Sequence, residues 1–133
     1  MNSEGVVMNP EGVVMNPEII KGALALAIQS SMKANARVEY RPEVKNYIVY
    51  LWKDGVLTGA VLKGKSEWDK MINAFENYCR ELKESVCEME ADAHLTFMIM
   101  NDKNFKQTLL TITDGITHYD FMTEGLPDDS KKM

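Results

Sequence analysis

Residues 46–64 contain two apolar runs on either side of the dipeptide Asp54-Gly55. Asp-Gly favours a two-residue hairpin turn, because a type I′ turn needs positive φ at both central residues. We therefore predict an antiparallel hairpin in which Trp52 faces Leu57 and the two strands pair over residues 46–64. Both faces of this hairpin would be apolar. The rest of the chain, or a second chain, is therefore expected to cover each face.

The chain of 133 residues is long enough for one domain with a hydrophobic core, and its 45% hydrophobic content is typical of globular proteins. Residues 1–21 repeat a seven-residue unit three times, as MNSEGVV, MNPEGVV and MNPEIIK. Gly or Pro breaks each copy, so residues 1–15 are predicted to be a repetitive flexible tail. A docking motif in tandem is the functional alternative for the repeat. We predict one domain over residues 16–123 and a polar tail over residues 124–133.

Two helices are predicted from capping residues and from apolar residues at three- and four-residue steps. Asn16, Pro17 and Glu18 form a favourable start for the first helix, which should continue to about residue 34. The second helix should begin at a capping box formed by Ser66 and Asp69 and continue to about residue 86. Its apolar stripe, the predicted cover of the hairpin, consists of Trp68, Ile72, Phe75, Cys79, Leu82 and Val86.

Four further strands are predicted outside the hairpin. A short edge strand over residues 37–44 should be interrupted at Pro42, since proline cannot donate to a strand ladder. Strands over residues 94–100, 105–113 and 116–122 should be joined by turns at residues 101–104 and at Asp114-Gly115. The expected fold is α+β and two-layered, with an antiparallel sheet of about five to six strands and two main helices in the order α-β-β-β-α-β-β-β. This order is similar to that of small roadblock-like or secretion-chaperone-like folds, an analogy that carries no function.

The two cysteines, Cys79 and Cys87, lie about two helical turns apart on the second predicted helix, too far for a disulfide. We interpret them as free thiols in a reducing, cytoplasmic compartment, with Cys79 serving as a small core residue. The start of the chain has no secretory pattern, and no apolar run approaches the ~18 residues of a membrane span. No Cys or His spacing indicates a metal, so no cofactor is expected.

The net charge of −5 is unevenly distributed along the chain. Residues 66–92 carry eight acidic and three basic side chains, whereas residues 37–65 carry six basic and three acidic ones. This balance argues against a nucleic-acid-binding face. The acidic run that closes the second helix is either a solvated helix face or a surface for a basic protein partner. Its members are Glu81, Glu84, Glu88, Glu90 and Asp92.

Two histidines are the candidates for chemistry. The stretch His94-Leu95-Thr96-Phe97 resembles half of the motif of two-histidine phosphoesterases, whereas residues 118–121 lack the required Ser or Thr. That resemblance implies two motifs that converge on one site. A second interpretation is a polar site in which an Asp orients a His as a general base, and ordinary strand histidines are the alternative to both. The residues of this site would be His94, Thr96, Thr111, His118 and Asp120.

Two classes of function follow from these patterns. The first is a non-catalytic protein-interaction module, an inhibitor, adaptor or chaperone such as those that phages and mobile elements encode. Its partner would be another protein with a basic surface, with Trp52 as an apolar anchor, and a homodimer is a further option. The second is a small ligand-binding domain or a phosphoesterase-like enzyme that uses His94 and His118. Neither a nucleic acid nor a membrane is expected as a partner.

Overall fold

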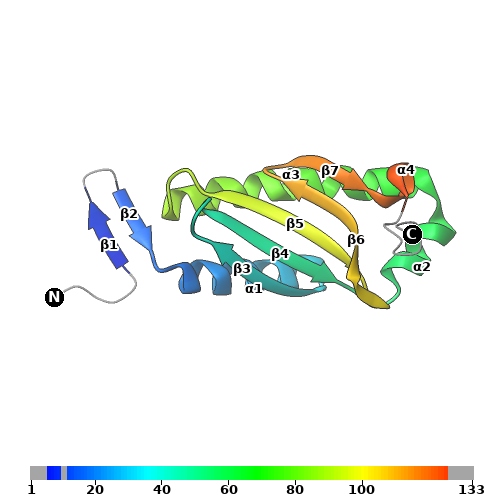
Figure 1. The fold of residues 1–133 in the computed structure, drawn as a ribbon, viewed down its shortest axis with the longest axis horizontal. Helices are drawn as coiled ribbons and strands as arrows, with labels where there is room; N and C mark the ends of the chain where they lie inside the picture. The colour runs from blue at the N-terminus through cyan, green and yellow to red at the C-terminus, as the bar shows by residue number, and fades with distance from the viewer. Residues whose placement is uncertain (1–5, 10–11, 126–133) are drawn as a thin grey trace, which may run out of the picture.

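The computed structural model describes residues 6–9 and 12–125 (Figure 1). Most of these residues belong to one layered α+β unit, in which helices lie on one face of a five-stranded sheet. In chain order the elements are β1 (Val6–Asn9), β2 (Gly12–Met15), α1 (Pro17–Met32), β3 (Asn35–Arg41), β4 (Asn46–Trp52), α2 (Val56–Lys63), α3 (Lys65–Met89), β5 (His94–Asn101), β6 (Asn104–Thr113), β7 (Ile116–Asp120) and α4 (Phe121–Glu124).

The main sheet has the strand order β3-β4-β5-β6-β7, which follows the chain. Three neighbouring pairs are antiparallel, and β4 and β5 are parallel. Parallel neighbours need a crossover, which α2 and the 25-residue α3 supply by returning the chain to the start of β5. The predicted α+β class is therefore confirmed. The prediction of an antiparallel sheet is wrong, because the sheet is mixed. Over the described residues, two short helices, α2 and α4, accompany the two main helices.

The predicted hairpin at Asp54-Gly55 does not form. Gly55 has φ +79, but Asp54 is not among the residues with positive φ, so the turn is not type I′. Both edges of β4 are already paired, with β3 on one side and β5 on the other. Residues 56–63 therefore have no free edge of β4 to join, and they form α2 instead.

The second Asp-Gly dipeptide does form the predicted hairpin. Asp114 and Gly115 have φ of 54° and 86°, as a type I′ turn requires, and the turn joins β6 to β7. A bulge then places one extra residue in β7, so Thr111 pairs with Tyr119 rather than with His118. The strand ends at Asp120, two residues earlier than predicted, because α4 begins there.

Both long helices were predicted, with one error in their starts. Asn16 caps α1 by accepting a hydrogen bond from the Glu18 amide at 2.8 Å. Helix α3 begins at Lys65 after Gly64 and has no side-chain cap, so the predicted capping box is wrong. Within the predicted apolar stripe, Trp68, Ile72, Cys79 and Val86 are buried, and Phe75 and Leu82 are half-buried.

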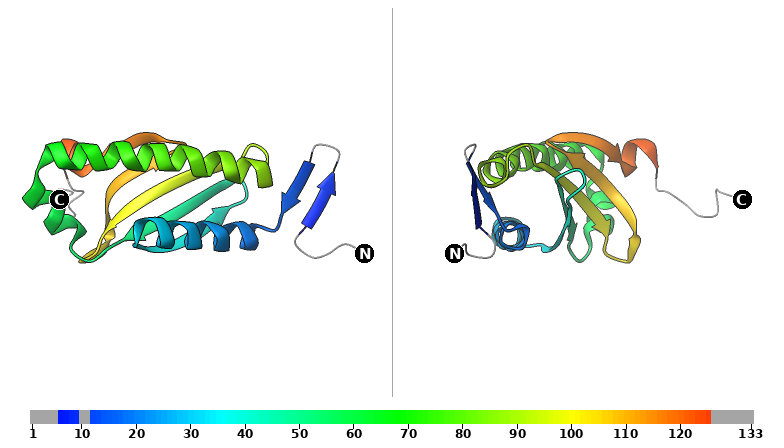
Figure 2. Two further views of the ribbon diagram at one scale, coloured as in Figure 1. Left: turned by 180° about the vertical axis from the view of Figure 1, so that it is seen from behind. Right: turned by 60° about the vertical axis from the view of Figure 1, so that its left-hand side comes forward.

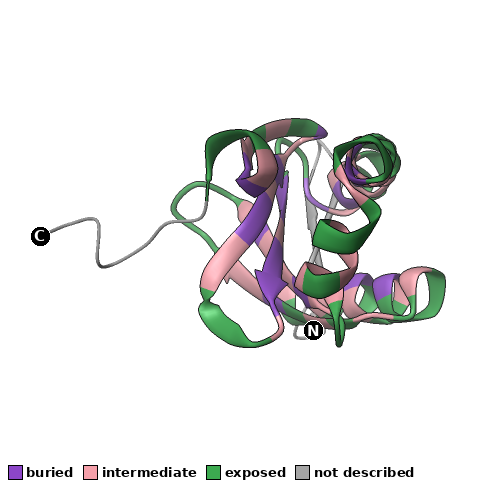
Figure 3. Ribbon diagram, turned by 90° about the vertical axis from the view of Figure 1, so that its right-hand side faces the viewer, coloured by how far each residue is buried: buried purple, intermediate pink, exposed green. Residues whose placement is uncertain are grey.

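Helices α1 and α3 pack on the same face of the sheet, and the hydrophobic core lies between them and that face (Figures 2 and 3). Tyr47, Val49, Phe97 and Ile112 are completely buried there. The alternate residues of β4, including Tyr50 and Trp52, lie on the opposite face and are only half-buried. Within the described chain, no helix covers this second face (Figure 3).

Strands β1 and β2 pair with each other as an antiparallel hairpin beside the N-terminal end of α1 (Figure 1). The repeated sequence of residues 1–15, expected to be a flexible tail, did not predict these strands. Residues 1–5, 10–11 and 126–133 lie outside the described residues, as does most of the predicted C-terminal tail. No helix within the described ranges is long and apolar enough to cross a membrane.

Candidate functional site

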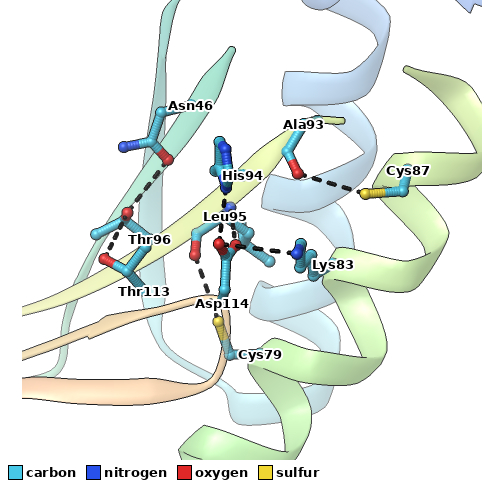
Figure 4. A network of polar contacts seen from close by, with 10 residues as sticks. All are labelled: Asn46, Cys79, Lys83, Cys87, Ala93, His94, Leu95, Thr96, Thr113 and Asp114. Carbon is cyan, nitrogen blue, oxygen red and sulfur yellow. Dashed lines mark hydrogen bonds and ion pairs between the residues drawn. The ribbon is translucent and has the colours of Figure 1, made fainter. Parts of the chain in front are cut away.

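A histidine and an aspartate meet where β5 begins, at the turn between β6 and β7 (Figure 4). The Nδ1 atom of His94 lies 2.7 Å from Oδ2 of Asp114, and the other oxygen of Asp114 accepts from the Leu95 amide at 3.0 Å. The Lys83 ammonium approaches the same carboxylate at 3.7 Å. Asp114 therefore fixes the imidazole, whose side chain is 49% exposed. A histidine oriented by a carboxylate is suited to proton transfer.

A hollow of about 440 Å³ adjoins this pair and is lined by residues that include Lys83, Cys87, Asp92 and His94. The Cys87 thiol donates a hydrogen bond to the Ala93 carbonyl at 3.3 Å. Among the described residues, no hydrogen bond joins Cys87 to His94. The hollow thus holds a base and a thiol with different partners, and it does not form a nucleophile–base pair.

Cys79 is a core residue, as predicted from its place in the apolar stripe. Its side chain is completely buried, and its thiol donates to the Leu95 carbonyl at 3.6 Å. Burial raises the pKa of the Cys79 thiol to about 11, because the apolar surroundings disfavour the thiolate. The thiolate is the reactive form, so Cys79 is unsuited to nucleophilic chemistry near neutral pH.

The structure does not bring the two histidines together. Thr96, Thr113 and Ile116 form one row across β5, β6 and β7. His94 lies two residues before this row and His118 two residues after it, on strands that run in the same direction. Strand geometry then places their Cα atoms roughly 15 Å apart. This backbone separation does not favour two histidines that converge on one phosphate, and the phosphoesterase interpretation stays a prediction.

The remaining members of the predicted polar site have structural partners. The Thr96 hydroxyl is buried and bonds to Asn46 and Thr113 at 3.2 and 3.0 Å. Thr111 pairs with Tyr119 across the strands and is half-buried.

Asp120 does not orient His118, as the sequence suggested it would. Its carboxylate accepts from the Trp68 indole at 2.6 Å and from the Met122 amide at 3.0 Å, and it caps α4. The bulge in β7 changes the alternation of faces, and Asp120 is turned toward α3. His118 itself is exposed. The predicted His118–Asp120 pair is therefore wrong.

The acidic run at the end of α3 divides into exposed and buried members. Glu81, Glu84 and Glu88 are exposed on α3, and Asp92 is exposed just beyond it. Glu90 is only 5% exposed, so its predicted place on a binding surface is wrong. Its backbone is extended, with φ −144°, because α3 has ended at the preceding residue. This turn directs the Glu90 side chain toward β3 and β4 rather than along the outer face of the helix.

Glu90 joins α3 to the strands through two tyrosines. Its carboxylate accepts hydrogen bonds from the Tyr40 hydroxyl at 2.5 Å and from the Tyr47 hydroxyl at 2.8 Å. The two phenol rings pack against each other at a tilt of 31°, with their centroids 4.3 Å apart. Burial, together with the Glu90 carboxylate, raises the pKa of Tyr40 to about 12 and raises the pKa of Tyr47 further.

These raised tyrosine pKa values predict a loss of stability at alkaline pH. Folded Tyr40 and Tyr47 keep their protons above pH 10, where the tyrosines of the unfolded chain lose theirs. The stabilisation is complete below about pH 10 and should decline as pH rises toward 12, by at most ~1.4 kcal/mol per pH unit for each tyrosine. Urea unfolding at pH 9, 10 and 11 measures this slope. The Tyr40→Phe, Tyr47→Phe double variant is the control, and an equal slope in both proteins would contradict the assignment.

Trp52 lies near the end of β4 with a neighbour far along the chain. Its ring packs edge-on against Phe105 with centroids 5.3 Å apart, and Phe105 is 56% exposed. Next to it on the same face, the Tyr50 hydroxyl donates to Glu39 at 3.2 Å, and the Arg37 guanidinium lies over the Tyr50 ring. Trp52 is thus a half-buried aromatic residue on the uncovered face, which is compatible with its predicted role as an anchor.

Sequence reasoning missed Asp114, Lys83, Tyr40 and Tyr47 as members of polar clusters. Asp114 was assigned only to its turn, and no local pattern links residues 40 and 47 to residue 90. Among the described residues, no three His, Cys, Asp or Glu side chains are placed to hold a metal ion. No protein-family model, curated protein or solved structure matches the chain.

Proposed function

We propose that this chain is a non-catalytic protein-interaction module that binds a basic protein surface through the end of α3. We call this surface the acidic face and define it as Glu81, Glu84, Glu88 and Asp92. The observation that supports the proposal is that all four carboxylates are exposed, and no ion pair among the described residues includes any of them.

The position of the acidic face is unfavourable for folding alone. Glu84 and Glu88 are four residues apart on one helix, where like charges repel by a few tenths of a kcal/mol, roughly 0.2–0.5. They also lie toward the C-terminal end of α3, where the helix dipole disfavours negative charge, and the last turn contains no basic residue. A basic partner would reduce both the repulsion between Glu84 and Glu88 and their unfavourable interaction with the helix dipole. These residues are therefore better suited to binding than to stabilising the helix.

The proposal is favoured over the enzymatic alternative by the separation of the histidines. His94 and His118 occupy different parts of the sheet, and Asp120 is bound to Trp68. The acidic face, by contrast, is formed by exposed residues of the last part of α3 and of the turn that follows it. In this proposal the module acts as an inhibitor, adaptor or chaperone of a basic protein.

Charge reversal on the acidic face should separate binding from folding. Glu84→Lys with Glu88→Lys should abolish capture of the basic partner and leave the fold intact, because positive charge suits a helix C-terminus. The control variant, Glu43→Lys with Asp54→Lys, makes the same change in net charge at exposed positions outside the acidic face. All three proteins are immobilised and exposed to one lysate, and the bound proteins are compared by quantitative mass spectrometry.

We expect at least one basic protein to bind the wild type and the control variant and to be lost from the acidic-face variant. Its association rate should also fall as salt rises, because screening weakens attraction between exposed charges. If every captured protein binds the acidic-face variant as well as the control, the acidic face is not the docking surface.

A further inference from the structure

An apolar cavity of about 300 Å³ is lined by residues from the places where α1 ends, α2 begins and β4 ends, near the end of α3 opposite the acidic face. Figure 2 shows these ends of the elements lying close together. Among the described residues, Lys53 is the only charged one in its lining. The apolar residues of the lining include Met32, Leu51, Val56, Met71, Phe75 and Ile99. Cavities of this size with mostly apolar walls are typical of small-molecule sites.

Part of the cavity wall is accessible to solvent, whereas the residues of the hydrophobic core are not. Leu51 and Ile99 form its floor and are 3% and 2% exposed, whereas Met32, Met71 and Phe75 remain half-buried. Phe75 is held from behind by an edge-on contact with Phe97, with centroids 6.4 Å apart. An alkyl chain placed here would remove apolar surface from water on several sides at once. The unbranched methionines can adjust to its shape.

A second hollow, of about 500 Å³, shares Lys53, Val56 and Met71 with the cavity and lies between α2 and α3. Lys63 and Lys70 also line this hollow. Glu67 pairs with Lys70 at 3.2 Å. In the part of the chain that the structure describes, no ion pair includes Lys53 or Lys63. The lining of the hollow contains three lysines and two acidic residues, Asp54 and Glu67, and therefore has a net positive charge beside the apolar cavity.

We infer that the cavity and the hollow together bind a small anionic amphiphile, a medium-chain alkyl carboxylate. The alkyl chain occupies the apolar cavity, and the carboxylate lies at its mouth near Lys53 and Lys63. This site is independent of the acidic face, which lies at the other end of α3. Neither site contributes a residue to the other, so each can fail without the other.

The test uses sodium decanoate below its micelle concentration as the probe and ¹³C-methyl methionine spectra of the full chain as the readout. The Met32 and Met71 signals, identified from Met→Leu variants, should shift in a saturable way. Met98 is half-buried in β5 and does not line the cavity, so its signal should stay in place. Decanol, which lacks the charge, should bind at least tenfold more weakly than decanoate.

Two variants separate the apolar and ionic parts of the site. Ala34→Leu projects a larger side chain into the cavity and should abolish the Met32 and Met71 shifts. Lys53→Glu should weaken decanoate binding at least tenfold and leave decanol binding unchanged. Lys106→Glu is the matched control, because Lys106 is exposed on β6 and does not line either hollow. A thermal unfolding curve confirms that each variant is folded.

Several results would overturn the inference. Shifts that spread to Met98 or fail to saturate would show that decanoate binds without a defined site. Equal affinity for decanol and decanoate, with no effect of Lys53→Glu, would show that the site does not recognise the carboxylate. If a second copy of the chain covers the cavity, light scattering will show a dimer, and the Met32 and Met71 signals will follow protein concentration rather than decanoate.

Discussion

Glu90→Ala is expected to lower the free energy of unfolding by about 3–5 kcal/mol, although its neighbours in the acidic run are exposed. The carboxylate accepts from Tyr40 and Tyr47 in a site where Glu90 is only 5% exposed. A hydrogen bond to a charged group contributes about 1.5–3 kcal/mol, and an unsatisfied buried hydroxyl costs about 1–3 kcal/mol. The substitution removes two such bonds at once. Urea unfolding at pH 7 measures the change.

The neighbouring residue supplies the control. Glu88→Ala removes one carboxylate of the same kind from an exposed position and should change stability by less than about 0.5 kcal/mol. The cost of Glu90→Ala should shrink in a Tyr40→Phe, Tyr47→Phe background, because the hydroxyls left unsatisfied are then absent. A loss below about 1 kcal/mol for Glu90→Ala in the wild-type background would show that these hydrogen bonds do not stabilise the fold.

This prediction separates folding from binding within one short stretch of sequence. Residues 84, 88 and 90 look alike in a count of charges, but the end of α3 at Met89 places Glu90 against the strands. Charge reversal at residue 90 would bury an ammonium between two phenols and unfold the chain. A binding experiment that included residue 90 would therefore report on stability. Glu84 and Glu88 are suited to the binding test because they carry no such partners.

The features that the sequence predicted correctly are local. The start of α1 follows from Asn16 and Pro17, whose capping geometry involves neighbouring residues only. The stripe of α3 follows from a period that continues over about five turns, from Trp68 to Val86, and includes buried residues such as Cys79. In each case the signal lies within a few residues of the feature that it predicts, and packing agrees with it.

The features that the sequence could not reveal depend on pairings between distant residues. Asp54-Gly55 and Asp114-Gly115 are identical dipeptides, yet only the second forms a hairpin. The difference is that β4 pairs with β5, more than forty residues later in the chain, and this parallel pairing leaves no edge for residues 56–63. The same pairing brings His94 beside Asn46 and determines which side chains meet in the polar clusters.

The candidate sites follow the same division. The acidic face was visible in the sequence because helical spacing alone places Glu81, Glu84 and Glu88 on one side of α3. The apolar cavity was not visible, because its lining comes from five separate elements. Phe75 was predicted as part of the apolar stripe of the second helix, and it is half-buried at the wall of that cavity. A surface on one helix can be predicted from residue spacing. A cavity can be predicted only when it is known which distant elements pack together.

Asp120→Ala is expected to lower the free energy of unfolding by about 2–4 kcal/mol through the loss of a buried acceptor and a helix cap. The Asp120 carboxylate accepts from the Trp68 indole at 2.6 Å, from the Met122 amide at 3.0 Å and from the Thr123 hydroxyl at 3.1 Å. Trp68 is 2% exposed and packs edge-on against Phe121, so its indole is shielded from bulk water in the folded chain. Denaturant unfolding followed by circular dichroism measures the loss.

Two comparisons identify the cause of that loss. Asp120→Asn keeps one acceptor oxygen and should recover about half of the stability, because the amide can still face the indole. The sequence had suggested that Asp120 orients His118, which is exposed. His118→Ala should change the free energy of unfolding by less than about 0.5 kcal/mol. A coupling energy of at least about 1 kcal/mol is expected between Asp120→Ala and Trp68→Phe in a double-mutant cycle. Additive effects in that cycle would mean that Asp120 acts through the cap of α4 alone and that its bond to Trp68 adds no stability.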